Sequence, residues 1–167
     1  MGGLLDSADL EVQADYGMFG IADPDGEEVD VPAGNWLSTG RSGFLVNVAS
    51  DLAHPAVRLE YWQGTPADPV EEHEVQETFR LFLPTGELAL NQISLGFEHD
   101  VLTVPAGHHR VRITGWGRER VQSTVQELRV RHPGLDSPER EAGYEALAGT
   151  EHYLVQFQLD ESTAVPG

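Results

Sequence analysis

Hydrophobic and polar side chains alternate along much of this chain, which is the pattern of β-strands with one buried face. Val57, Leu59 and Tyr61, for example, share one face of a stretch whose other face carries Arg58 and Glu60. Similar alternating or apolar stretches occur at 10–22, 43–49, 55–62, 75–83, 87–94, 101–104, 108–114 and 153–159. Turns rich in proline and glycine separate them, and long helical crossovers between them are missing. We therefore predict an all-β fold, an antiparallel β-sandwich of about seven or eight strands.

One short helix is expected in the C-terminal region. Ser137 suits the N-cap, Pro138 suits the first helical position, and Glu139 is an early acid that interacts well with the helix dipole. We expect the helix to reach about Leu147 and to end before Gly149.

The length of 167 residues suits a single domain, which we place at 10–160 between flexible ends at 1–9 and 161–167. The chain has no cysteine, so it has neither a disulfide nor a thiolate nucleophile. Its first residues lack a basic segment and a long apolar run, so they match neither a signal peptide nor a membrane anchor. We expect a cytoplasmic protein that does not bind membranes.

Charge narrows the possible partners. Asp and Glu number 28 and Lys and Arg only 10, which gives a formal net charge of −18. A surface this negative repels nucleic acid and anionic membranes and attracts basic proteins, although adaptation to high salt also produces acidic surfaces. Residues 1–40 contain nine acids and no base, whereas six arginines gather in the segment 110–131. There, Gly115 and Gly117 suggest the end of a strand, with Arg118 and Arg120 in solvent.

No pattern typical of a catalytic or metal site stands out. The chain lacks a G-x-S-x-G nucleophile elbow, a G-K-[ST] phosphate loop and an H-E-x-x-H zinc motif. His108 and His109 are adjacent on an expected strand, so they point to opposite faces and cannot bind one ion together. Asp23 begins a run similar to a calcium loop, but Gly34 stands where a bidentate glutamate is needed, so a hairpin turn explains the run better. We expect no enzyme activity, no cofactor and no metal.

Two groups of carboxylates are the candidate partner-binding residues. The first lies in the expected hairpin and the second in an expected exposed loop: Asp23, Asp25, Glu27, Glu28 and Asp30, and then Glu71, Glu72, Glu74 and Glu77. Carboxylates at this density imitate the charge of duplex nucleic acid. A basic protein with a cationic groove, such as a nuclease or toxin, would be steered to them and blocked.

Three segments resemble a known family. The stretch 10–23, LEVQADYGMFGIAD, resembles the first strand of the competence protein J-like nuclease inhibitors. The stretch 102–113, LTVPAGHHRVRI, resembles their strand, P-x-G turn and following strand. The stretch 151–158, EHYLVQFQ, resembles the closing strand of related actinobacterial proteins of unassigned function, which often end in Trp-Pro where Gln158 and Leu159 stand here. The resemblance implies a β-sandwich that binds and inhibits a nuclease. It carries over no catalytic residue, and an insertion at about 133–150 departs from it.

The favoured hypothesis is a non-catalytic acidic binding protein of inhibitor or immunity type that occludes a basic protein partner. Two alternatives stay open. A structural or assembly subunit of a larger complex would use exposed apolar edges. A carbohydrate- or ligand-binding module would expose Trp36, Trp62 or Trp116, although tryptophans in a sandwich more often belong to the core or its edge. The sequence does not indicate an oligomeric state.

Overall fold

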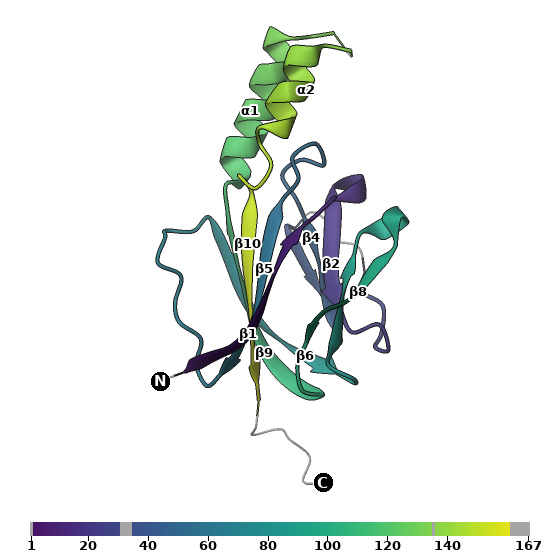
Figure 1. Ribbon diagram of the computed structural model, residues 1–167, viewed down its shortest axis with the longest axis vertical. Helices are drawn as coiled ribbons and strands as arrows, with labels where there is room; N and C mark the ends of the chain where they lie inside the picture. The colour runs from purple at the N-terminus through teal and green to yellow at the C-terminus, as the bar shows by residue number, and fades with distance from the viewer. Residues whose placement is uncertain (1, 31–34, 135, 161–167) are drawn as a thin grey trace.

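Two five-stranded β-sheets make up most of the computed structural model, which describes residues 2–30, 35–134 and 136–160. Sheet A consists of β1 (Gly3–Glu11), β5 (Ala56–Gln63), β10 (His152–Leu159), β9 (Gly107–Trp116) and β6 (Val75–Leu83), in that spatial order. Sheet B consists of β3 (Leu37–Thr39), β4 (Gly43–Asn47), β2 (Met18–Ala22), β7 (Glu87–Asn91) and β8 (Phe97–Thr103), again in spatial order. Figure 1 shows the two sheets side by side, with the helices beyond one end of them.

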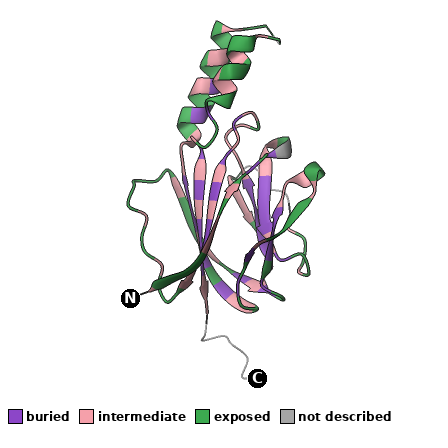
Figure 2. Cartoon of the chain, viewed as in Figure 1, coloured by how far each residue is buried: buried purple, intermediate pink, exposed green. Residues whose placement is uncertain are grey.

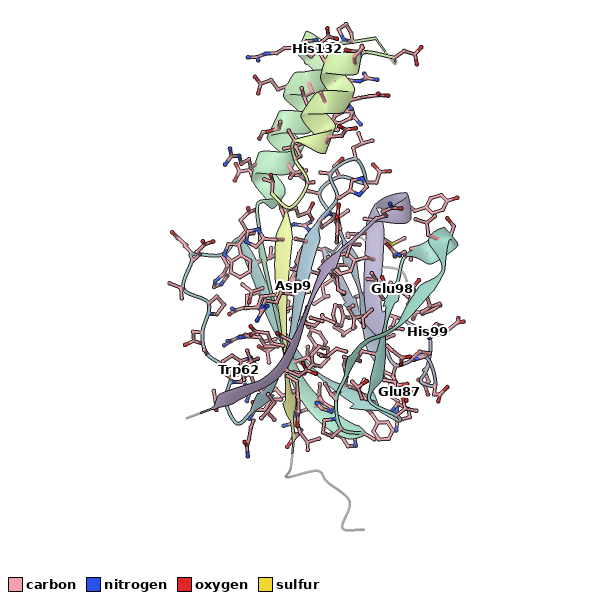
Figure 3. The ribbon with its side chains drawn as sticks, in the orientation of Figure 1. Asp9, Trp62, Glu87, Glu98, His99 and His132 are labelled. Carbon is pink, nitrogen blue, oxygen red and sulfur yellow. The ribbon has the colours of Figure 1, made fainter. Side chains whose placement is uncertain are left out.

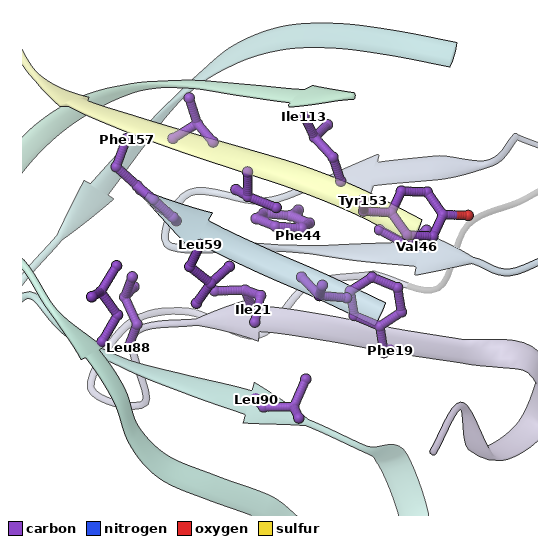
Figure 4. Close-up of a cluster of buried hydrophobic side chains, with 14 of the residues drawn as sticks. Phe19, Ile21, Phe44, Val46, Leu59, Leu88, Leu90, Ile113, Tyr153 and Phe157 are labelled. Atoms are coloured by element: carbon purple, nitrogen blue, oxygen red, sulfur yellow. The ribbon is translucent and has the colours of Figure 1, made fainter. Parts of the chain in front are cut away.

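The inward-facing side chains of both sheets form one hydrophobic core, as in a β-sandwich. Figure 4 shows Phe19, Ile21 and Phe44 of sheet B in one cluster with Leu59 and Phe157 of sheet A. All five side chains are fully buried. Figure 2 shows the same concentration of buried residues along the strands. Truncating any of these side chains to alanine would cost about 2–5 kcal/mol, so this cluster fixes how the sheets lie on each other.

The prediction of a mainly β fold is confirmed, but the strand count and the pairing were wrong in part. The described residues form ten strands, and β1 begins at Gly3, earlier than the expected start of the sandwich at residue 10. The expected stretch 10–22 divides between β1 and β2, because a 3-10 turn at Asp15–Gly17 separates them.

One pair of strands is parallel, contrary to the all-antiparallel prediction. β10 lies in the centre of sheet A, antiparallel to β9 on one side and parallel to β5 on the other. A parallel pair needs a long connection. Here that connection is the whole chain from β6 to the helices, which no local pattern reveals.

A helical hairpin projects from one end of the sandwich (Figure 1). It consists of α1 (Arg118–Arg131) and α2 (Pro138–Glu145). The expected late helix is α2, and Ser137 caps it by accepting a hydrogen bond of 3.2 Å from the backbone N–H of Arg140. Figure 3 labels His132, which follows α1 at the far end of the hairpin.

Helix α1 was not expected from the sequence. β9 runs to Trp116, two residues beyond the expected strand and within the segment where a strand end was expected, but Gly117, with φ of 75°, turns the chain directly into the helix. Val121, Val125 and Leu128 recur every three or four residues, which was an available helical signal. At the base of the hairpin a second cluster of buried apolar side chains joins it to the loop after β4: Ala53, Val121, Val125 and Leu147.

Neither α1 nor α2 is long and apolar enough to cross a membrane, and the same holds for every helix within the described ranges. The expected flexible end at 161–167 lies outside the described residues.

Candidate partner-binding surfaces

Asp23, at the start of the acidic loop (residues 23–30), has a buried side chain, only 1% of the residue being exposed. Its carboxylate accepts hydrogen bonds from the backbone N–H groups of Thr85 (2.8 Å), Gly86 (2.9 Å) and Asp25 (3.1 Å), and from the hydroxyl of Thr85 (2.9 Å). Burial alone would raise the pKa of this carboxyl, but the hydrogen bonds from Thr85, Asp25 and Gly86 outweigh it and hold the pKa below its ordinary value. Asp23 therefore fastens the loop to the turn between β6 and β7, and it cannot itself meet a partner.

The other four carboxylates of the acidic loop are exposed: Asp25, Glu27, Glu28 and Asp30. None of the four forms an ion pair with another described residue. Their negative charge therefore faces solvent without a local cation to balance it. Four of the five candidate carboxylates in this segment are therefore exposed on one loop, as an exposed binding surface requires.

A groove of about 360 Å³ opens beside the acidic loop on the outer face of sheet B. We call it the sheet B groove. Its floor is Gly20 and Ala22 of β2, which alternate with the buried core residues of that strand, and Leu45 of β4. Glu27 and Glu28 line the end that follows Ala22.

The other end of the sheet B groove is aromatic. The strand register places Phe97 beside Asn91, and Asn91 beside Gly20. Phe97 is 50% exposed, and its ring stacks on that of His99 at 6.1 Å between centroids. Figure 3 shows His99 and Glu98 on the outer edge of sheet B. The sheet B groove therefore has an acidic end, a small apolar floor and an aromatic end.

The second acidic segment (residues 71–77) lies elsewhere. Its four candidate carboxylates, Glu71, Glu72, Glu74 and Glu77, are exposed. Glu74 accepts a hydrogen bond of 3.1 Å from the backbone N–H of Glu119, so it also supports the start of α1. Glu74 precedes β6, whereas Asp23 contacts the turn that follows β6. At about 3.3 Å per residue, the nine residues of β6 place Glu74 roughly 30 Å from the turn that Asp23 contacts, whereas Glu77 lies within β6 itself.

Arg118 is not in solvent, contrary to the sequence prediction, whereas Arg120 is exposed as expected. The Arg118 side chain is only 15% exposed. It donates hydrogen bonds of 2.6 Å to the backbone carbonyl of Asn47 and to the hydroxyl of Tyr153. It also lies 3.6 Å from a carboxylate oxygen of Glu151.

Glu151 is a fully buried carboxylate that the sequence did not reveal. It accepts hydrogen bonds from the Tyr153 hydroxyl and, at 3.0 Å, from the backbone N–H of Ala49. Burial raises the pKa of Glu151 even though these bonds and the charge of Arg118 oppose the shift. The cluster links β10, α1 and the loop after β4, so its role is structural. Its members are scattered along the sequence, and no local spacing signals their contact.

The three tryptophans are all half-buried. Trp36 packs on the main core, stacks on Tyr153 with ring centroids 6.4 Å apart, and borders a pocket of about 380 Å³. Trp62 donates its indole N–H to Glu60 at 2.8 Å. Trp116 stacks on His152 at 4.9 Å and lines an open pocket of about 530 Å³. Trp116 therefore borders the larger of the two pockets, and its volume suits a ligand of ordinary size.

The described residues do not form a metal-binding site. Within 2–30, 35–134 and 136–160, no three histidine, aspartate or glutamate side chains are arranged to hold a metal ion. Buried His109 contacts the carbonyl oxygen of Pro105 through Nε2 at 2.7 Å, and burial lowers the pKa of its imidazole.

Two solved structures share this fold. One is the crystal structure of ComJ from Bacillus subtilis, an inhibitor of the DNA-degrading activity of NucA. It matches with a TM-score of 0.54 and 9% identity over 96% of this chain and 99% of ComJ. The other is crocagin biosynthetic protein J, with a TM-score of 0.52 and 17% identity over 96% of this chain and 99% of that one. No family model and no curated sequence matches. The chain thus shares its overall fold with a member of the family that the sequence resemblance named.

Proposed function

We propose that this protein is a non-catalytic acidic binding protein that occludes a basic site on a protein partner, as an inhibitor or immunity protein does. The observation that carries the proposal is the acidic loop, whose exposed carboxylates stand unpaired beside the sheet B groove. The shared fold with ComJ, an inhibitor of a DNA-degrading activity, supports a nuclease as the class of partner.

The structure of the loop suits tight binding. Asp23 fixes the start of the loop with hydrogen bonds from Thr85, Gly86 and Asp25, so this part of the loop is held in place before a partner arrives. Pre-ordering lowers the entropy lost on binding. The net charge of −18 steers a basic partner toward the protein, and the unpaired carboxylates of Glu27 and Glu28 then meet its cations.

The test measures the rate at which an extract of the source cells degrades duplex DNA at low ionic strength, with and without the purified protein. We expect the purified protein to slow this degradation. The charge-reversed variant Glu27→Arg/Glu28→Arg should need about ten times more protein for the same effect, since it loses two carboxylates and gains two repelling charges.

A matched control carries the same charge change at a distance. Glu141 and Glu145 are exposed on α2, so Glu141→Arg/Glu145→Arg should change the potency by less than about twofold, through long-range effects alone. The proposal fails if the wild-type protein leaves the degradation unchanged. It also fails if the control variant loses as much potency as the loop variant, because the effect would then be unspecific charge.

One observation favours a second candidate, a carbohydrate- or ligand-binding module. Trp116 and His152 form a stacked aromatic pair in a pocket of about 530 Å³. Such rings can pack against the apolar face of a sugar. A glycan panel followed by tryptophan fluorescence tests this candidate, and unchanged emission with every glycan would count against it.

A further inference from the structure

The sheet B groove is large enough to receive one side chain of a partner. Its volume of about 360 Å³ falls at the small end of ligand pockets. Ala22 carries only a methyl group, and the Leu45 side chain packs over Gly20, so the floor of the groove is apolar and has no long side chain rising from β2. Leu45 is only 5% exposed, so it closes the floor as a packed apolar side chain. A partner side chain could therefore lie flat on sheet B.

The two ends of the groove differ in chemistry. Glu27 and Glu28 supply carboxylates at one end, and Phe97 supplies a half-exposed ring at the other. An occupant needs a cationic head for the first end and an apolar stem for the floor. Arginine and lysine both have such stems. Only arginine also has a planar head that donates two parallel hydrogen bonds to carboxylate oxygens.

We infer that the sheet B groove binds an arginine side chain of the basic partner. Its guanidinium meets Glu27 and Glu28, and its stem lies over Ala22 and Leu45 toward Phe97. This inference rests on the proposed function and makes it specific, since it names the residue type that the partner must present. The surplus of negative charge on the chain makes a basic occupant the complementary one.

The first experiment compares two probes of equal charge. The peptide Gly-Arg-Gly-Arg-Gly, blocked at both ends, and its lysine analogue are titrated into the isotopically labelled protein at low salt, and amide shifts are followed by NMR. We expect the arginine peptide to bind at least about threefold tighter. The largest shifts should gather at Gly20, Ala22, Leu45 and Phe97.

The second experiment tests the two ends of the groove with variants. Glu27→Gln/Glu28→Gln should weaken the arginine peptide about tenfold, and Phe97→Ser about threefold. Phe97 is half exposed, so the serine variant should fold, which circular dichroism verifies. The control Glu141→Gln/Glu145→Gln removes the same charge from α2 and should stay within about twofold of wild type.

Three results would overturn the inference: equal affinity for both peptides, shifts spread over the whole surface, or a control variant as weak as the groove variant. These outcomes are separable from a failure of the proposed function. If the peptides do not discriminate but Glu27→Arg/Glu28→Arg still loses inhibition of DNA degradation, the inhibitor function stands and the arginine anchor falls. If the peptides behave as expected but the protein leaves DNA degradation unchanged, the anchor stands without a nuclease.

Discussion

At the scale of single residues, neighbouring carboxylates that look alike in the sequence have different roles. Asp23 and Asp25 are two residues apart, yet the first is buried and bonded while the second is exposed. Thr85 and Gly86 cause this difference. They reach Asp23 because the turn after β6 lies beside the end of β2. The sequence could locate the acidic loop, but it could not show which of its carboxylates is buried and hydrogen-bonded within the fold.

Asp23→Asn should lower the free energy of unfolding at neutral pH by about 2 kcal/mol, because an amide presents only one acceptor oxygen to several backbone N–H groups. The wild-type carboxyl has a pKa below its ordinary value of 3.8 in the folded state. Its contribution is therefore complete above about pH 4 and is lost as the pH falls through the folded pKa. Urea unfolding from pH 7 down to pH 3 should show the two proteins converging at the acidic end.

Asp25→Asn is the control, since it removes the same charge from an exposed side chain and should cost less than about 0.5 kcal/mol. A cost for Asp23→Asn that equals the control, or that does not shrink in acid, would contradict the structural role of Asp23.

At the scale of elements, the strands followed from alternation, while helix α1 and the parallel pair did not. Alternation reports which face of a strand is buried, so it correctly located β5, β6 and β9. It does not report which strand lies next to which. Arg118 shows the same limit, because its partners Asn47 and Tyr153 lie on segments far from it in the sequence.

Arg118→Met should destabilise the fold by about 3 kcal/mol at neutral pH, because it leaves the buried Glu151 without its cation. The pKa of Glu151 in the folded state is raised above its ordinary value of 4.5. Ionisation of this carboxyl therefore destabilises the fold increasingly as the pH rises above about 4.5. The cost of Arg118→Met should therefore be larger at pH 8 than at pH 5, measured by urea unfolding.

Arg120→Met is a close control, because Arg120 is exposed on the same turn of α1 and should contribute less than about 0.5 kcal/mol. If both arginine variants cost the same at every pH, the buried network does not hold the helical hairpin.

At the scale of the whole molecule, composition supplies the prediction of a basic partner, and the fold decides which carboxylates are exposed to it. The net charge of −18 favours a basic partner, and the fold leaves the four carboxylates after Asp23 in the acidic loop exposed. Composition could not show that Glu74 and Asp23 lie near opposite ends of β6. Nor could it show that the sheet B groove lies beside only one of them.

Added salt should act in opposite directions on folding and on partner binding. Raising NaCl from about 20 mM to about 500 mM shortens the Debye length from roughly 20 Å to roughly 4 Å, which screens the self-repulsion of the acidic chain. The thermal unfolding midpoint should rise by several degrees, while inhibition of DNA degradation should weaken. A midpoint that falls with NaCl would show that the surface acids are already balanced within the fold.

The central place of β10 has a consequence for the order in which the molecule can be made. Synthesis delivers β1, β5, β6 and β9 first, and until residues 152–159 emerge these strands form two separate halves of sheet A. Each half then exposes an unsatisfied edge beside apolar core residues such as Leu59 and Ile113. The nascent chain must therefore remain unassembled, and open to misassociation, until one late strand joins both halves.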